Sequence, residues 1–230
     1  MQKFWNWVRD ETKGTRTLYL DGVIASESWF DDDITPAAFK EELYAADGPV
    51  TIFLNSPGGD CFAASQIYTM LMEYPDDVHV KIDGIAASAA SVIAMAGTKV
   101  LMAPTALMMM HRPLTVAMGN TDDMQRAINM LDEVKESILN AYEIKTGLAR
   151  SVLSQMMDSE TWLSANKAVE LHFADGILER QAGPELPSAS NFQFSSRAAT
   201  NVLLNKLTPP APTKPGTPWA DLDKRLALLH

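Results

Sequence analysis

Two side chains in this sequence could together carry out nucleophilic catalysis, Ser88 and His111. A serine attacks a carbonyl carbon when a base within hydrogen-bond reach accepts its proton. Ser88 lies in a stretch composed almost entirely of small residues, 84–97, which would let another molecule approach the backbone closely. Of the four histidines, His111 is the best candidate base, because it ends an apolar run and precedes Arg112 and Pro113, where the chain must turn. Taken alone, the small-residue stretch fits a tightly packed buried helix equally well.

Acyl transfer also requires hydrogen-bond donors for the negative charge that develops on the carbonyl oxygen. We expect Ser88 at the start of a helix, where the N–H of Ala89 has no partner within the helix. Gly58 and Gly59 follow a predicted strand and carry no side chains, so the N–H of Gly59 could face a substrate. A glycine pair by itself also fits a simple tight turn. The candidate donors are therefore the backbone N–H groups of Gly59 and Ala89.

The predicted elements place these residues at one edge of a sheet. Strands and helices alternate along the first half of the chain, which is typical of an α/β domain with a mostly parallel sheet and right-handed crossovers. Functional sites in such sheets lie where the strands end, and the glycine pair, Ser88 and His111 all follow predicted strands. The expected strands are 18–24, 50–54, 78–82, 99–104, 106–111 and 176–178; the expected helices are 35–47, 62–73, one within 84–97, 121–146, 149–157 and 166–171.

Composition narrows the class of protein. The chain has 230 residues and a net charge of -10, which argues against binding to nucleic acid or to anionic membranes. No apolar run reaches the ~18 residues that a membrane-spanning helix needs, and the N-terminus lacks a signal-peptide pattern. The single cysteine, Cys61, excludes an internal disulfide framework and suits a reducing compartment. We therefore expect a cytoplasmic protein.

The sequence divides into three parts. An N-terminal segment, 1–16, precedes the α/β domain, 17–180. Beyond Arg180 the composition changes, and the segment 181–230 is rich in proline. This pattern predicts a largely extended, flexible C-terminal tail, which is either a solvated tail or a docking peptide.

Three ordered motifs together resemble the Clp protease proteolytic subunit family of serine peptidases: NSPGG at 55–59, GIAAS at 84–88 and MMHRPL at 109–114. The resemblance covers roughly residues 17–180 and is greatest to the head-maturation proteases of phages and prophages. It implies a fold of stacked βαβ units shared with the crotonases, with a protruding handle helix, 121–143, through which rings of subunits pair. It also implies Ser88 as nucleophile, His111 as general base, and the N–H groups of Gly59 and Ala89 as the oxyanion hole.

The third member of the implied triad is open between two acidic residues. The family places an aspartate just before an aromatic residue that is followed by a Leu-Ser-Ala-like segment, which here is 162–165. The matching position is Glu160, and Asp158 lies two residues earlier. A glutamate can orient a histidine but is one methylene longer, so its backbone would need to lie further back. We favour Glu160 over Asp158, although both also fit a solvated acidic turn. His172 stands where family members often have glycine, and we expect it at a helix end.

The leading hypothesis is a serine endopeptidase that forms an acyl-enzyme on Ser88 and acts in phage or prophage capsid maturation or in Clp-type protein degradation. It would act without a metal or other cofactor, as a homo-oligomeric ring or stacked rings, on polypeptides such as scaffold and capsid precursors. A phage-encoded protein would work in the host cytoplasm or the procapsid. No equivalent of the N-terminal loops that engage an ATPase ring is evident, which favours independence from such a partner. The alternatives are a crotonase-type acyl-CoA enzyme and an inactive ring-forming assembly factor.

Overall fold

The computed structural model describes residues 5–10, 15–25 and 36–179, and the structural statements that follow concern these residues. The predicted proline-rich tail, 181–230, lies outside them. All described residues belong to one compact unit. Within them, no helix is long and apolar enough to cross a membrane.

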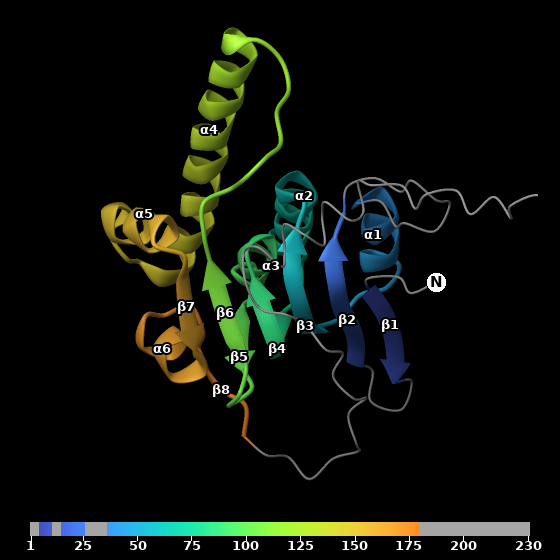
Figure 1. Ribbon diagram of the computed structural model, residues 1–230. Coiled ribbons are helices and arrows are strands. Elements are labelled where there is room, and N and C mark those ends of the chain that lie inside the picture. The colour runs from blue at the N-terminus through green and yellow to red at the C-terminus, as the bar shows by residue number, and fades with distance from the viewer. Residues whose placement is uncertain (1–4, 11–14, 26–35, 180–230) are drawn as a thin grey trace, which may run out of the picture. The chain divides into compact units, whose positions relative to one another are not determined.

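A mostly parallel eight-stranded sheet forms the centre of the described part of the chain (Figure 1). Its main path runs β1-β2-β3-β4-β5-β8, while β6 pairs with β4 and with β7. Among the described strands, only the pairs β1–β2 and β6–β7 are antiparallel. The strands are β1 (Trp5–Asp10), β2 (Thr15–Ile24), β3 (Val50–Gly59), β4 (Val78–Ala87), β5 (Lys99–Met102), β6 (Leu107–Met110), β7 (Thr161–Ser164) and β8 (Gly176–Ile177). The predicted α/β class with a mostly parallel sheet is confirmed.

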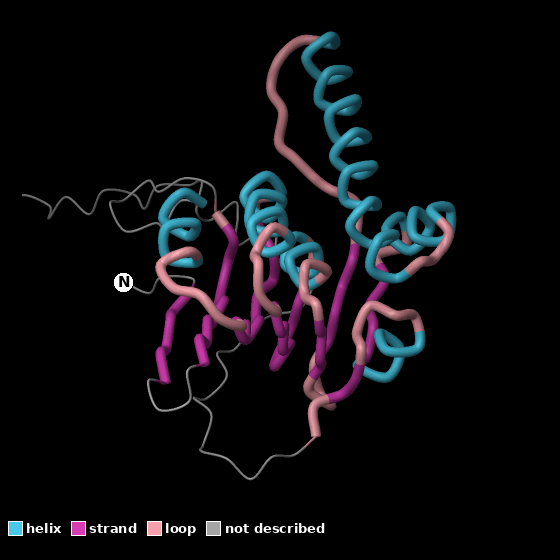
Figure 2. Tube along the Cα trace, turned by 180° about the vertical axis from the view of Figure 1, so that it is seen from behind, coloured by secondary structure: helices cyan, strands magenta, loops and turns pink. Residues whose placement is uncertain are grey.

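Helices α1, α2 and α3 cover the same face of this sheet, as the opposite views in Figures 1 and 2 show. Burial alternates along β3, where Val50, Ile52 and Leu54 are fully buried and the residues between them are half-buried. This period of two is what a sheet with one well-covered face requires. The helices are α1 (Pro36–Leu43), α2 (Cys61–Met72), α3 (Ala89–Ala94), α4 (Thr121–Thr146), α5 (Arg150–Asp158) and α6 (Ala165–Glu170).

Strands β3 and β4 run further at their C-terminal ends than the sequence predicted. The turn expected after Leu54 is instead the end of β3, which continues to Gly59, and β4 continues past Ile82 to Ala87. Strand β4 changes its partner along the way: its first half pairs with β5 and its last three residues pair with β6. Local periodicity did not reveal the continuation, because these second halves are held by neighbours that are distant in sequence. Only the six residues of α3 remain helical in the small-residue stretch.

The long helix α4 extends away from the sheet in Figure 1. Asn120 caps its N-terminus by accepting hydrogen bonds from the N–H groups of Asp122 and Asp123, and Gly147 ends it with a left-handed φ of 67°. The C-terminal part of α4 is buried against the body at Ile138, Leu139, Ala141 and Tyr142. The part nearer the N-terminus exposes Ile128 and Met130.

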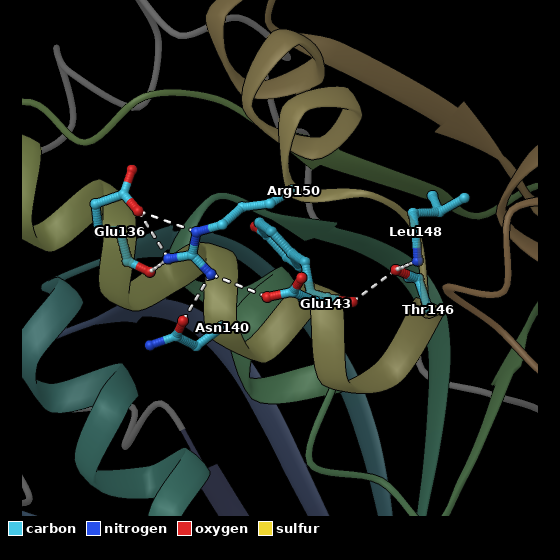
Figure 3. Close-up of polar contacts among 7 residues, drawn as sticks. Glu136, Asn140, Glu143, Thr146, Leu148 and Arg150 are labelled. Atoms are coloured by element: carbon cyan, nitrogen blue, oxygen red, sulfur yellow. Dashed lines mark hydrogen bonds and ion pairs between the residues drawn. The ribbon is translucent and has the colours of Figure 1, made fainter.

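Arg150 folds α5 back onto α4 (Figure 3). Its guanidinium donates to Glu136 Oε2 from Nε at 3.0 Å and from Nη2 at 2.8 Å. Nη1 donates to Asn140 Oδ1 at 2.7 Å and to Glu143 Oε2 at 3.0 Å. These contacts fix the direction in which α5 leaves the corner, and the end of α5 leads directly into residues 158–160 of the site described next.

Candidate active site

Ser88 forms the sharp turn between strand β4 and helix α3. Its backbone has φ 54° and ψ -124°, a conformation that residues other than glycine rarely adopt and that tends to occur at functional sites. The N–H of Ser88 donates to the carbonyl of Met109 at 2.8 Å. This bond continues the pairing of β4 with β6, in which Ala87 lies opposite Met109. The turn therefore presents the serine beside the end of β6.

His111 meets the Ser88 hydroxyl at that position. It follows the last residue of β6, and its Nε2 lies 2.7 Å from Ser88 Oγ. Parallel pairing explains the contact, because β4 and β6 end at the same edge of the sheet. Burial lowers the pKa of His111 below its ordinary value, and the negative charge of Glu160 partly opposes this effect by raising it. A lowered pKa favours the neutral imidazole, which can accept a proton.

Glu160 lies across from His111 because of a second strand pairing. Strand β7 runs antiparallel to β6 with Thr161 opposite Met110, so the residue before Thr161 comes close to the residue after Met110. Glu160 has a left-handed backbone, with φ 47°. Its Oε1 accepts a hydrogen bond from the indole Nε1 of Trp162 at 3.3 Å. Its charge acts on His111, although no direct hydrogen bond joins the two side chains in the described part of the chain.

Asp158 points to other partners. Its Oδ1 accepts from Lys135 Nζ at 2.6 Å and lies 3.5 Å from Arg112 Nε. The hydrogen bond and charge of Lys135 lower the pKa of this exposed carboxyl, and Arg112 adds to the effect. Glu160, and not Asp158, is the carboxylate whose charge perturbs His111. Of the two acidic candidates, the charge of Glu160, which the sequence favoured, acts on His111.

The two glycines of the NSPGG motif have different surroundings. A Cβ on Gly58, whose φ is 93°, would lie 2.6 Å from Ala87 O, 2.8 Å from Ser88 Cβ and 3.0 Å from Ala89 N. A Cβ on Gly59 would instead lie 2.0 Å from the carbonyl oxygen of Ile24 on β2. Gly58 is therefore the glycine that packs directly against the start of α3. Sequence reasoning gave the donor role to Gly59 and treated Gly58 only as part of the same turn.

Ser91 and His172 have other surroundings than the Ser88–His111 pair. Ser91 is fully buried, and its hydroxyl donates to Ser88 O at 2.6 Å and is 2.8 Å from the hydroxyl of Tyr142. It stabilises the turn but does not face His111. His172 lies just after α6 with φ 62°, as expected for a helix end. Among the described residues, no cluster of three or more His, Cys, Asp or Glu side chains could hold a metal ion.

Comparison with known proteins shows which family this chain resembles. The model of the Clp protease family matches residues 14–181. The ATP-dependent Clp protease proteolytic subunit of Porphyromonas gingivalis is 31% identical over 156 residues, which cover 65% of this chain and 70% of the relative. Subunit 2 of Thermobifida fusca is 31% identical over 154 residues, 64% of this chain and 76% of the relative. The subunit of Ligilactobacillus salivarius is 27% identical over 170 residues, 71% of this chain and 86% of the relative.

The family match spans every residue of the site, from the glycine pair through Ser88 and His111 to Glu160. The mostly parallel α/β sheet and its long helix α4 are consistent with the fold that the motifs implied. The chain belongs to the Clp protease family.

Proposed function

We propose that this protein is a serine endopeptidase that cleaves polypeptides through an acyl-enzyme on Ser88. The observation that carries the proposal is the 2.7 Å contact between Ser88 Oγ and His111 Nε2 at the edge where β4 and β6 end. A nucleophile and a base at hydrogen-bond distance are what acyl transfer requires. Membership of a family of protease subunits supports the same reaction class.

In the proposed reaction, His111 Nε2 accepts the proton of Ser88 as Oγ attacks the carbonyl carbon of the scissile bond. The tetrahedral intermediate carries a negative oxygen, which the N–H groups of Ala89 and Gly59 stabilise. His111 then gives its proton to the leaving amine, and the acyl-enzyme forms. Water, activated by the same histidine, releases the acyl group and restores Ser88.

Glu160 is the proposed third member of the triad. Its carboxylate stabilises the imidazolium that forms when His111 accepts a proton, which is consistent with the rise that its charge causes in the pKa of His111. Asp158 is already bound to Lys135 and Arg112, which argues against this role for it. Burial of His111 acts in the opposite direction and keeps the resting histidine neutral.

The segment after His111 suits an extended polypeptide substrate. Residues 111–118 form no helix or strand, and Leu114, Val116 and Met118 are exposed at alternating positions. An extended backbone next to the nucleophile can pair with a substrate strand, which is the strand-addition mode of peptide binding. We further propose that α4 pairs subunits in a ring or stacked rings, and that the substrates are scaffold or capsid precursors or proteins marked for Clp-type degradation.

A fluorophosphonate probe tests the chemistry, because it phosphonylates only an activated serine. We expect labelling of the purified full-length protein, loss of labelling in Ser88→Ala, and normal labelling in Ser137→Ala, which removes an exposed hydroxyl on α4. Mass spectrometry should find the adduct on Ser88. Turnover of an acyl-CoA thioester without labelling would indicate the crotonase-type alternative. A folded, assembled protein that neither reacts with the probe nor hydrolyses peptides would instead indicate an assembly factor.

A further inference from the structure

The indole of Trp162 holds one oxygen of Glu160. Trp162 Nε1 donates to Glu160 Oε1 at 3.3 Å, from the position two residues further along the chain. This hydrogen bond does not involve His111. It restrains Glu160, however, and the charge of Glu160 acts on His111. Nothing in the proposed chemistry uses the tryptophan directly.

The ring that carries this N–H is itself fixed by packing. Ala87 on β4 lies opposite Met109 on β6, and Met109 lies opposite Trp162 on β7, so the three residues form a row across three strands. Ile85, Ala87 and Met109 are buried in a small apolar cluster separate from the main core, and Trp162 packs against it. The indole N–H is therefore anchored by the strands that carry Ser88 and His111.

Glu160 has more freedom than an aspartate would have in its place. The glutamate side chain has an additional rotatable bond, and fixing it costs more conformational entropy. The left-handed backbone of Glu160 fixes where the side chain starts but not where the carboxylate ends. A donor that holds Oε1 removes part of this freedom before the reaction begins.

We propose that Trp162 is a positioning residue, whose indole N–H holds the Glu160 carboxylate beside His111. The inference rests on the proposed function, because Glu160 matters only if His111 becomes charged during the reaction. In this role Trp162 does not act by contact with the substrate or the reacting atoms. It acts by keeping the negative charge close to the imidazolium as that charge forms.

The test is Trp162→Phe in the full-length protein, which keeps an aromatic ring and removes the donor. We expect kcat/KM for a fluorogenic peptide to fall about tenfold, roughly the factor that one charge-assisted hydrogen bond supplies. The pKa of His111, followed by NMR of the ring, should fall further below its ordinary value because the Glu160 charge is less well placed. Ile85→Val trims the same apolar cluster without removing a donor; it should lower thermal stability but leave the pKa of His111 unchanged.

A double-mutant cycle separates positioning from packing. In the Glu160→Gln background, Trp162→Phe should cause no further loss of kcat/KM. An equal loss in both backgrounds would overturn the proposal, because Trp162 would then act through packing alone. Unchanged kinetics in Trp162→Phe would overturn it too, and higher activity would show that the indole draws Glu160 away from His111. Loss of probe labelling in Ser88→Ala supports the proposed protease function whatever the results for Trp162→Phe, so the two proposals can fail separately.

Discussion

The ionisation of His111 connects the geometry of the site to a measurable pH dependence. The neutral imidazole is the active base, so activity rises with pH as His111 loses its proton. Burial lowers the pKa of His111, and Glu160 partly raises it again. The acid limb of kcat/KM should therefore lie below the ordinary histidine value of about 6.5.

Replacing Glu160 and replacing Asp158 should change the pH dependence of activity in different ways. Glu160→Gln removes the charge that raises the pKa of His111, so the acid limb should move to lower pH while kcat falls on the order of 100-fold, because the imidazolium in the transition state loses its partner. Asp158→Asn should change kcat much less and leave the limb in place, since Asp158 bonds Lys135 and Arg112. Stopped-flow or fluorogenic assays from pH 5 to 9 measure both effects. The reverse ranking would assign the orienting role to Asp158.

Gly58 offers a second test at the level of single residues. Gly58→Ala places a Cβ 2.6 Å from Ala87 O and 2.8 Å from Ser88 Cβ, and the clash must displace the turn that carries the nucleophile. We expect loss of probe labelling. Gly22→Ala is the matched control, because Gly22 has a similar φ of 94° but no atom within 4 Å of the added carbon.

Both glycine substitutions should cost about 1–2 kcal/mol of stability for the left-handed backbone, and the clash of Gly58→Ala should destabilise that variant further. Only Gly58→Ala should lose labelling as well. If Gly58→Ala keeps full reactivity in a folded protein, the start of α3 tolerates displacement and Gly58 has no part in forming the site. Differential scanning fluorimetry together with labelling distinguishes these results.

Strand β4 is the element that brings Ser88 next to His111, because it changes its pairing partner from β5 to β6. The change occurs at 83–85, between the pairing of Ile82 with Met102 on β5 and the pairing of Ile85 with Leu107 on β6. Asp83 lies at this point with its Oδ1 buried and without a hydrogen-bond partner among the described residues. Burial, with a further contribution from the charge of Asp21, raises the pKa of Asp83 to about 6.

A raised carboxyl pKa makes stability depend on pH in a defined direction. Between about pH 4 and pH 6 the folded protein holds a proton on Asp83 that the unfolded chain releases, so stability falls as the pH rises through this window. Asp83→Asn should remove this loss, and the midpoint of thermal unfolding should rise by about 2–4 °C at pH 8, equivalent to ~1 kcal/mol after allowance for partial exposure. The gain should vanish near pH 4. Asp77→Asn, at an exposed position, should give no such gain; equal midpoints for the wild type and Asp83→Asn at pH 8 would contradict the argument.

At the scale of the whole molecule, helix α4 is the surface that we expect to assemble subunits. Its C-terminal part is buried in the body, whereas Ile128 is 51% exposed and Met130 is 42% exposed. Exposed apolar side chains on a helix that extends from the body are typical of an interaction surface. Pairing through this helix would bury them.

Introducing a charge on this surface should reduce the size of the assembly. Ile128→Glu places a carboxylate in the proposed interface, and mass photometry should show smaller particles while circular dichroism remains unchanged. Ser137→Glu adds the same charge to an exposed position on another face of α4 and should leave the particle mass unaltered. An unchanged mass for Ile128→Glu would exclude this part of α4 from the interface.

Much of this organisation was predictable from local sequence. The alternation of strands and helices indicated the α/β fold, and the end of an apolar run singled out His111. The small residues around Ser88 marked a close approach of backbone and another group. The expected helix 121–146 ends just before Gly147, where the structure has a left-handed residue. These features depend on residue size, periodicity and backbone freedom, which neighbours along the chain determine.

Tertiary structure decided what depends on pairing between distant segments. The continuation of β4 to Ala87, its change of partner, and the placement of Glu160 opposite the end of β6 all follow from hydrogen bonds between strands. The sequence favoured Glu160 over Asp158 but kept both, because the distinction is which carboxylate acts on His111 and which bonds Lys135. It could not separate the roles of Gly58 and Gly59, because only the packing of β3 between β2 and β4 shows which glycine faces Ser88. Local sequence thus determined the candidate residues, and long-range strand pairing determined how they meet.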